Sequence, residues 1–94
     1  MKNYELMTLT KGTAGESVAK EMTKTVKELI ESLGGKVTKS DFWGKRKLAY
    51  KIRVETDGYY EVTQFEFPSD KIDNIKKKLN LEDNLVRYLI TAKS

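Results

Sequence analysis

The sequence contains no cysteine and no histidine, and these two absences exclude much of protein chemistry. Without cysteine the chain can form no disulfide, no thiolate nucleophile, no zinc finger and no iron–sulfur centre. Without histidine it lacks the commonest general base and the commonest metal ligand. We therefore expect no catalytic residues, no metal site and no cofactor.

Long apolar runs are missing as well. No run approaches the roughly 20 residues that a membrane-spanning helix needs. The opening residues, Met-Lys-Asn-Tyr-Glu, lack the apolar stretch of a signal peptide. We expect residues 1–94 to form a single domain in the cytoplasm, with no membrane partner and no small-molecule substrate.

The basic residues gather in one segment. The whole chain carries a net charge of +4. Residues 36–53 hold seven basic residues and one acidic residue, a net charge of +6, so the rest of the chain carries −2. Such a segment is typical of a surface that faces a polyanion. It also fits a lysine-rich edge strand that resists aggregation, and charge alone does not decide between the two.

Hydrophobic periodicity predicts two helices. Apolar residues recur every three or four positions over residues 18–33, and a pair of glycines then ends the helix. Thr13 and Glu16 have the spacing of a capping box at its start. Ser69 is expected to cap the second helix, which extends to Leu79 with acidic residues in its first turn and three lysines in its last.

Period-two patterns predict strands over residues 3–10, 36–53, 59–67 and 85–92, with a turn at 55–58. In the second strand the alternation slips by one position across Gly44, which indicates either a bulge in a continuous strand or a tight turn between two strands. The order β-α-β-β-α-β, with right-handed crossovers, predicts an α+β fold: a ferredoxin-like split β-α-β sandwich. Its four-stranded antiparallel sheet carries two helices on one face, and the second and fourth strands are the edges.

Residues 41–52 are the most specific stretch of the chain. They combine a tryptophan, a glycine, three consecutive cations and an apolar run. Cations contact phosphates, whereas aromatic rings stack on bases or fill a partner's pocket. The simpler interpretation is that the apolar residues, Leu48 and Ile52 in particular, only fill the core.

Residues 43–50, Trp-Gly-Lys-Arg-Lys-Leu-Ala-Tyr, resemble the tryptophan-glycine-basic-basic-x-leucine-alanine-tyrosine motif of bacterial small-subunit ribosomal protein S6. The resemblance covers nearly the whole chain, and residues 84–90, Asn-Leu-Val-Arg-Tyr-Leu-Ile, are similar to the family's ending. The chain departs from the family at Lys51, where proline is usual, and at Tyr59, where histidine is frequent. Neither change removes a proposed contact.

The resemblance implies a continuous second strand that is bent at Gly44, and a structural protein without enzymatic activity. It also implies binding to the central domain of 16S ribosomal RNA, in the platform of the small subunit, as a heterodimer with ribosomal protein S18. The RNA-binding residues expected from the matching positions are Lys45, Arg46, Lys47 and Arg87. Lys2, Tyr4 and Lys93 are added because we expect them to lie near these residues. The two lysines also fit an ordinary solvated terminus, and Tyr4 also fits core packing. The partner-binding residues expected on the edge strands and the open sheet face are Trp43, Tyr50, Tyr60 and Leu89.

Three alternatives share this fold. An acylphosphatase-like enzyme would need a positioned arginine beside a glycine loop, and the loop at residues 11–15 has glycines but no arginine. A regulatory module that binds a metabolite fits the fold but leaves the basic strand unexplained. An RNA-recognition motif would stack bases on aromatic residues such as Tyr60, but its glycine–aromatic spacing is not matched.

Overall fold

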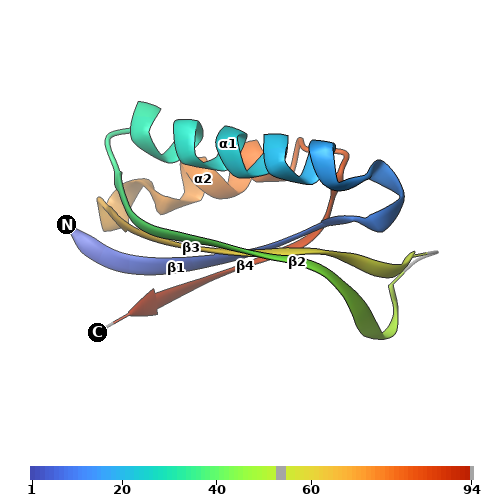
Figure 1. The fold of residues 1–94 in the computed structure, drawn as a ribbon. Helices are drawn as coiled ribbons and strands as arrows, with labels where there is room; N and C mark the ends of the chain where they lie inside the picture. Colours follow the sequence, from blue (N-terminus) through green and yellow to red (C-terminus); the bar gives the residue numbers. More distant parts are fainter. Residues whose placement is uncertain (53–54, 94) are drawn as a thin grey trace.

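The computed structural model shows four strands and two helices in the order β-α-β-β-α-β (Figure 1). The structure describes residues 1–52 and 55–93. The side chains of residues 47–52, 55 and 56 lie outside this description, and so do the predictions made for the side chains of Lys47, Leu48, Tyr50, Lys51 and Ile52. The elements are β1 (Lys2–Lys11), α1 (Glu16–Ser32), β2 (Lys36–Ile52), β3 (Glu55–Phe67), α2 (Ile72–Leu79) and β4 (Leu85–Lys93), with short 3-10 helices at Gly12–Ala14 and Ser69–Lys71.

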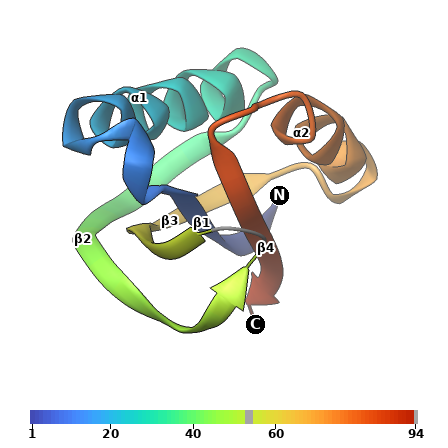
Figure 2. The same ribbon diagram turned by 90° about the vertical axis from the view of Figure 1, so that its right-hand side faces the viewer.

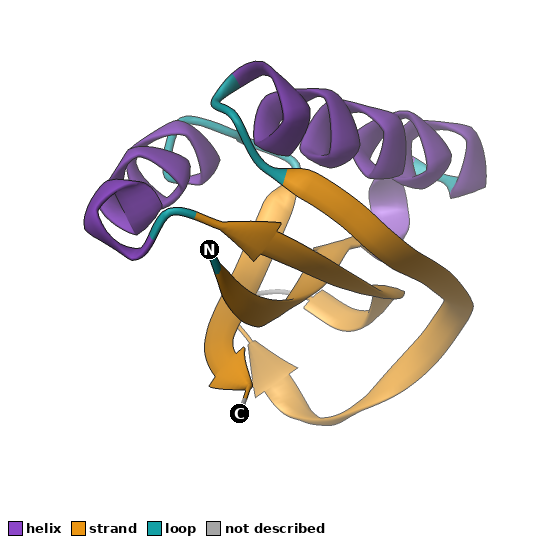
Figure 3. Ribbon diagram, turned by 90° about the vertical axis from the view of Figure 1, so that its left-hand side faces the viewer, coloured by secondary structure: helices purple, strands orange, loops and turns teal. Residues whose placement is uncertain are grey.

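The strands form one antiparallel sheet in the order β2-β3-β1-β4. Both helices cover one face of this sheet, and the other face is open (Figures 1 and 3). The ferredoxin-like prediction is therefore confirmed, with the basic strand β2 at one edge and β4 at the other. In the described ranges, no helix is long and apolar enough to cross a membrane.

The hydrophobic core lies between the helices and the sheet. From α1 it receives one residue per turn, namely Met22, Val26 and Ile30, because residues four apart share one side of a helix. From the sheet it receives alternate residues of each strand, such as Leu6 and Phe65, which are both fully buried. This alternation leaves the remaining strand residues on the open face.

β2 is continuous over 17 residues and bends at Gly44. Its pairing with β3 shifts between Phe42 and Gly44, and Gly44 has a φ of +81°. Glycine adopts this left-handed conformation without the clash that a Cβ would cause. The bulge and the continuous bent strand are therefore confirmed. After the bend, β2 curves away from the helices toward the side of the open face (Figures 1 and 2).

The two capping predictions are wrong. Thr13 lies in a 3-10 helix, so the residue that precedes α1 is Gly15, and no side chain caps the helix. Ser69 also lies in a 3-10 helix, so α2 begins after Lys71, again without a side-chain cap. In both cases a short 3-10 helix separates the predicted capping residue from the α-helix.

The predicted turn at residues 55–58 is also wrong, because these residues belong to β3. Gly58 pairs with Lys11 on one side and with Arg46 on the other. A Cβ at Gly58 would approach the backbone oxygen of Thr10 to 2.8 Å. The absence of a side chain at Gly58 therefore allows neighbouring strands to approach closely. Close backbone approach is a common role of glycine within a sheet.

Candidate nucleic-acid interface

The open face is divided into a polar half and an apolar half. Residues opposite each other in the strand register share a face, so the register arranges the side chains in rows from β2 to β4. Two rows form the polar half: Lys36, Glu66, Asn3 and Lys93, followed by Lys39, Gln64, Glu5 and Thr91. Two further rows form the apolar half: Asp41, Val62, Met7 and Leu89, followed by Gly44, Tyr60, Leu9 and Arg87.

The apolar half contains two of the predicted partner-binding residues. Tyr60 is half-buried, and Leu89 is 53% exposed. A third, Trp43, is 48% exposed on the edge strand, directly before Gly44. The structure thus brings Trp43, Tyr60 and Leu89 to the same half of the sheet. Exposed large apolar side chains of this kind are typical of a surface that binds another macromolecule.

The predicted RNA-binding cations of β2 follow the bend directly. Lys45 and Arg46 are both exposed. The Lys45 Nζ lies 3.4 Å from the Asp57 Oδ2, and the Arg46 guanidinium donates a hydrogen bond to the backbone oxygen of Lys45 at 3.1 Å. Arg87 is exposed on the opposite edge strand, with β3 and β1 between. The structure therefore places Lys45 and Arg46 on one edge strand of the sheet and Arg87 on the other.

The three positions added by proximity lie at the other end of the sheet. Lys2 pairs with Phe67 at the end of β3, whereas Lys45 pairs with Tyr59 near its start. Eight residues of extended strand separate these points, or about 26 Å. Lys93 is exposed, and its Nζ lies 3.4 Å from the Glu5 Oε2.

Tyr4 lies on the helix-covered face and is only 6% exposed. Its ring is stacked on that of Phe65, with the centroids 5.6 Å apart. Both rings belong to the hydrophobic core. The position of Tyr4 therefore agrees with the core-packing interpretation.

Glu61 is a buried carboxylate that the sequence analysis missed. It lies on the helix-covered face of β3 and is 3% exposed. Burial raises the pKa of this carboxyl group, and hydrogen bonds from the hydroxyl groups of Thr23, Thr63 and Ser40 offset part of the rise. The sequence could have indicated this burial, because the alternation along the strand places Glu61 on the same face as Phe65.

Two of the apolar-half residues, Leu9 and Val62, are buried although they lie on the open face. The alternation predicts that Val62 shares a face with Tyr60, but the sequence analysis did not predict that Leu9 and Val62 are buried there. The signal was the row of apolar residues in β1, where Leu6, Met7 and Leu9 follow one another too closely for strict alternation. Apolar residues on both faces of a strand indicate that both faces are covered, at least in part.

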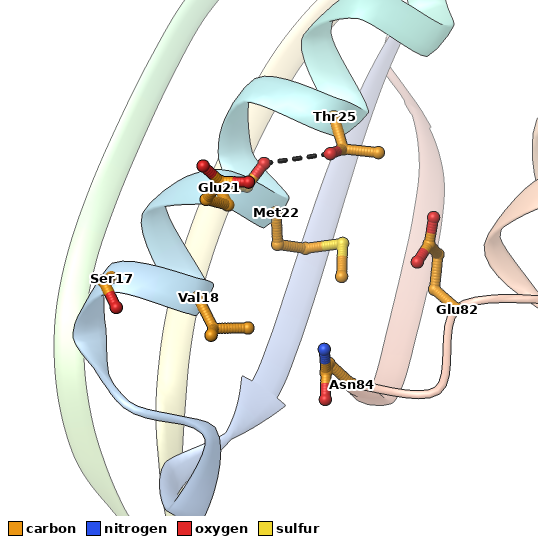
Figure 4. Close-up of a pocket in the computed structure, with 7 residues that line it drawn as sticks. All are labelled: Ser17, Val18, Glu21, Met22, Thr25, Glu82 and Asn84. Carbon is orange, nitrogen blue, oxygen red and sulfur yellow. Dashed lines mark hydrogen bonds between the residues drawn. The ribbon is translucent and has the colours of Figure 1, made fainter.

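The largest hollow described lies in the helical layer and not on the open face. It has a volume of about 450 Å³ and lies between α1 and the segment that leads into β4 (Figure 4). Glu21 and Glu82 line it from these two elements, and none of the described lining residues is basic. A polyanion would be repelled there. Among residues 1–52 and 55–93, no group of three or more acidic side chains is placed to hold a metal ion.

The fold, the divided open face and the basic bent edge define a small α+β domain that presents charged and apolar surfaces to other macromolecules. The family model for ribosomal protein S6 matches residues 3–92 of this chain. The chain therefore belongs to the ribosomal protein S6 family, as the motif at residues 43–50 predicted. It is a structural protein of the small ribosomal subunit in the cytoplasm, and the enzyme alternative is wrong.

Individual relatives agree with this assignment. The small ribosomal subunit protein bS6 of Dictyoglomus turgidum is 38% identical over 91 residues, which cover 97% of this chain and 94% of that protein. The protein of the same name from Caldanaerobacter subterraneus is 36% identical over 90 residues, or 96% and 95% of the two chains. The crystal structure of 30S ribosomal protein S6 from Thermotoga maritima matches with a TM-score of 0.93 over 98% of this chain and 87% of that one. Its sequence identity is 24%, so it supports the fold alone.

Proposed function

We propose that this chain binds the central domain of 16S ribosomal RNA, in the platform, through the cations of its bent edge strand. The observation that carries the proposal is the exposure of Lys45 and Arg46 on the outer strand of the sheet, directly after the bend at Gly44. An edge strand has no neighbour on its outer side, so a duplex or loop of RNA can approach it without displacing another element.

The chemistry is neutralisation of phosphates. Each phosphate that a lysine or arginine neutralises releases counterions, which makes the binding salt-dependent. Arg46 has five N–H donors, and the described contact with the Lys45 carbonyl oxygen uses only one of its nitrogens. Lys47 follows in the same run, and Arg87, Lys2 and Lys93 extend the proposed contact area to β4 and the far end of the sheet. Tyr4 would act by anchoring β1, because its ring is buried.

Sedimentation of ribosomal subunits tests this proposal. Three tagged forms are expressed in the native host: the wild type, a variant with Lys45→Gln, Arg46→Gln and Lys47→Gln, and a control variant with Lys20→Gln, Lys24→Gln and Lys27→Gln on the exposed side of α1. After a moderate salt wash, the wild type and the control are expected to migrate with the small subunit, and the β2 variant to remain at the top of the gradient. Retention of the β2 variant at the wild-type level would refute the role of this strand.

We further propose that ribosomal protein S18 docks on the apolar half of the open face. Leu89 and Trp43 are the exposed anchors, and Tyr60 lies between their strands on β3. Large apolar and aromatic side chains with a neighbouring arginine are the composition that interface centres favour. Tyr50 is included because it lies in the same strand as Trp43. Unpaired backbone N–H and C=O groups of the edge strands could add hydrogen bonds to a strand of the partner.

Calorimetry with the purified partner tests the docking site. Leu89→Ser should weaken the affinity for S18 about fivefold or more, because truncation of an anchor residue at an interface centre costs more than about 1 kcal/mol. Leu81→Ser is the matched control, since Leu81 is an exposed leucine outside the sheet. Equal affinities of the two variants would exclude the apolar half as the contact.

A further inference from the structure

We propose that the polar half of the open face holds one unpaired nucleotide of ribosomal RNA, whose base is recognised by the side chains of Asn3 and Gln64. The inference rests on the proposed RNA-binding function. It adds a site at the opposite end of the sheet from the basic run of β2, and it assigns that site a different kind of contact, with a base and not only with phosphates.

A hollow of about 230 Å³ lies at this end of the sheet. It is lined by Asn3, Tyr4, Thr38, Gln64, Phe65 and Lys93. Sites for drug-sized ligands measure roughly 300–1,000 Å³, so this hollow suits a single base and not a longer stretch of nucleic acid. Its lining comes from β1, β2, β3 and β4 together, which makes it a feature of the assembled sheet.

Asn3 and Gln64 are diagonal neighbours in this hollow. Asn3 pairs with Glu66, two residues beyond Gln64 on β3, and diagonal neighbours are about 7–8 Å apart, within reach of long side chains. No described contact within residues 1–52 and 55–93 engages either side-chain amide. By contrast, the backbone oxygen of Gln64 accepts a hydrogen bond from the Thr38 hydroxyl at 3.1 Å, which fixes the edge of the hollow.

An amide side chain offers a donor and an acceptor at once. The pairing edge of a base likewise presents donors and acceptors side by side, and unpaired bases in RNA loops are recognised along that edge. A phosphate presents acceptors only, so two amides would be a poor choice for it. The pair Asn3 and Gln64 therefore fits a base better than it fits the RNA backbone.

The charges around the hollow favour the same orientation. Cations stand at both edges of the polar half, with Lys36 and Lys39 on β2 and Lys93 on β4. Carboxylates stand in the middle, with Glu66 on β3 and Glu5 on β1. A phosphate over the middle would be repelled, whereas the N–H groups of a base could donate to these carboxylates. A nucleotide would thus lie with its base inward and its phosphates toward the edges.

Lys36 at this end of the sheet is available to phosphates. It is exposed and forms no ion pair with any described residue. Lys93 is held by Glu5, with 3.4 Å between Nζ and Oε2. This pair places the ammonium group at the wall of the hollow.

Chemical probing of small subunits tests the inference. Subunits are assembled with the wild type, with an Asn3→Ala and Gln64→Ala double variant, with an Asn74→Ala control on the exposed side of α2, or without this protein. Dimethyl sulfate, kethoxal and a water-soluble carbodiimide then modify the pairing edges of accessible bases: adenine and cytosine, guanine, and uracil respectively. The wild type and the control should protect one unpaired base that is reactive without the protein, and the double variant should leave it reactive while staying bound, with affinity reduced about tenfold.

Two results would overturn the inference. One is a double variant that protects the same bases as the wild type, and the other is a double variant whose loss of protection spreads to every base contact, which would indicate general release from the subunit. Either result leaves the proposed role of β2 intact. If the wild type itself is not recovered with ribosomal RNA, then the proposed function fails, and the inference fails with it.

Discussion

The ammonium group of Lys45 lies 3.4 Å from the carboxylate of Asp57, across the paired strands β2 and β3. Both side chains are partly exposed, at 53% and 36%. Exposed ion pairs contribute only about 0–1 kcal/mol to stability, so this pair has little effect on the fold. Its main effect is electrostatic, because Asp57 places a negative charge beside the cations that we propose to contact RNA.

Removal of that charge should strengthen RNA binding. Asp57→Asn is expected to raise the affinity for the central-domain RNA about two- to fivefold at low salt, and the gain should shrink as salt screens the charges. Fluorescence anisotropy with labelled RNA measures this. Asp73→Asn is a matched control, because Asp73 also pairs with a lysine, Lys76, but on α2. A weaker or unchanged affinity for the Asp57 variant would contradict a phosphate contact at Lys45.

The bend at Gly44 should depend on its backbone conformation and not on space. A Cβ there would meet no atom closer than the Arg46 guanidinium at 3.9 Å, but the φ of +81° disfavours any residue with a Cβ. Gly44→Ala is expected to lower the free energy of unfolding by about 1–2 kcal/mol. Gly44→Asn should cost less, because asparagine tolerates positive φ better. Urea titration compares the three proteins, and equal stability of wild type and alanine variant would show that the bend is not strained.

The buried carboxyl group of Glu61 predicts a pH-dependent stability. Because burial raises its pKa in the folded state above the unfolded value, the folded state binds the proton more tightly than the unfolded state. Wild-type stability is therefore reduced as the pH rises from the ordinary glutamate pKa through the raised one. Glu61→Gln removes this loss.

Unfolding titrations across the pH range test the Glu61 prediction. The stability gained by Glu61→Gln over the wild type should be smallest under acidic conditions, should grow as the pH rises, and should be constant above the raised pKa. Glu31→Gln, on the exposed side of α1, controls for the loss of one negative charge. A stability difference that is the same at every pH would show that Glu61 ionises in the fold as readily as in the unfolded chain.

The architecture was largely predictable because its determinants are local. The apolar stripe of α1, the alternation in the strands and the rule of right-handed crossovers together predict the strand order, and hence that β2 and β4 are edges. The same alternation correctly placed Tyr60 and Leu89 away from the helices. Their meeting in one apolar half follows from the pairing of β1 with both β3 and β4.

What could not be predicted depends on contacts between distant segments. Residues 55–58 have the composition of a turn. The close approach of Gly58 to Thr10 explains why a glycine stands within a strand there. Asn3 and Gln64 are 61 positions apart in the sequence, and only the register of β1 against β3 brings them to one hollow. The burial of Glu61 likewise depends on hydroxyl groups supplied by α1 and β2.

The salt dependence of binding tests whether the cations after the bend of β2 neutralise phosphates of ribosomal RNA. The slope of the logarithm of the affinity against the logarithm of the salt concentration counts the neutralised phosphates, at roughly 0.7–0.9 per contact. The variant with Lys45→Gln, Arg46→Gln and Lys47→Gln should have a slope that is shallower by about two to three, and the variant with Lys20→Gln, Lys24→Gln and Lys27→Gln on α1 should keep the wild-type slope. An unchanged slope for the β2 variant would show that these cations neutralise no phosphates.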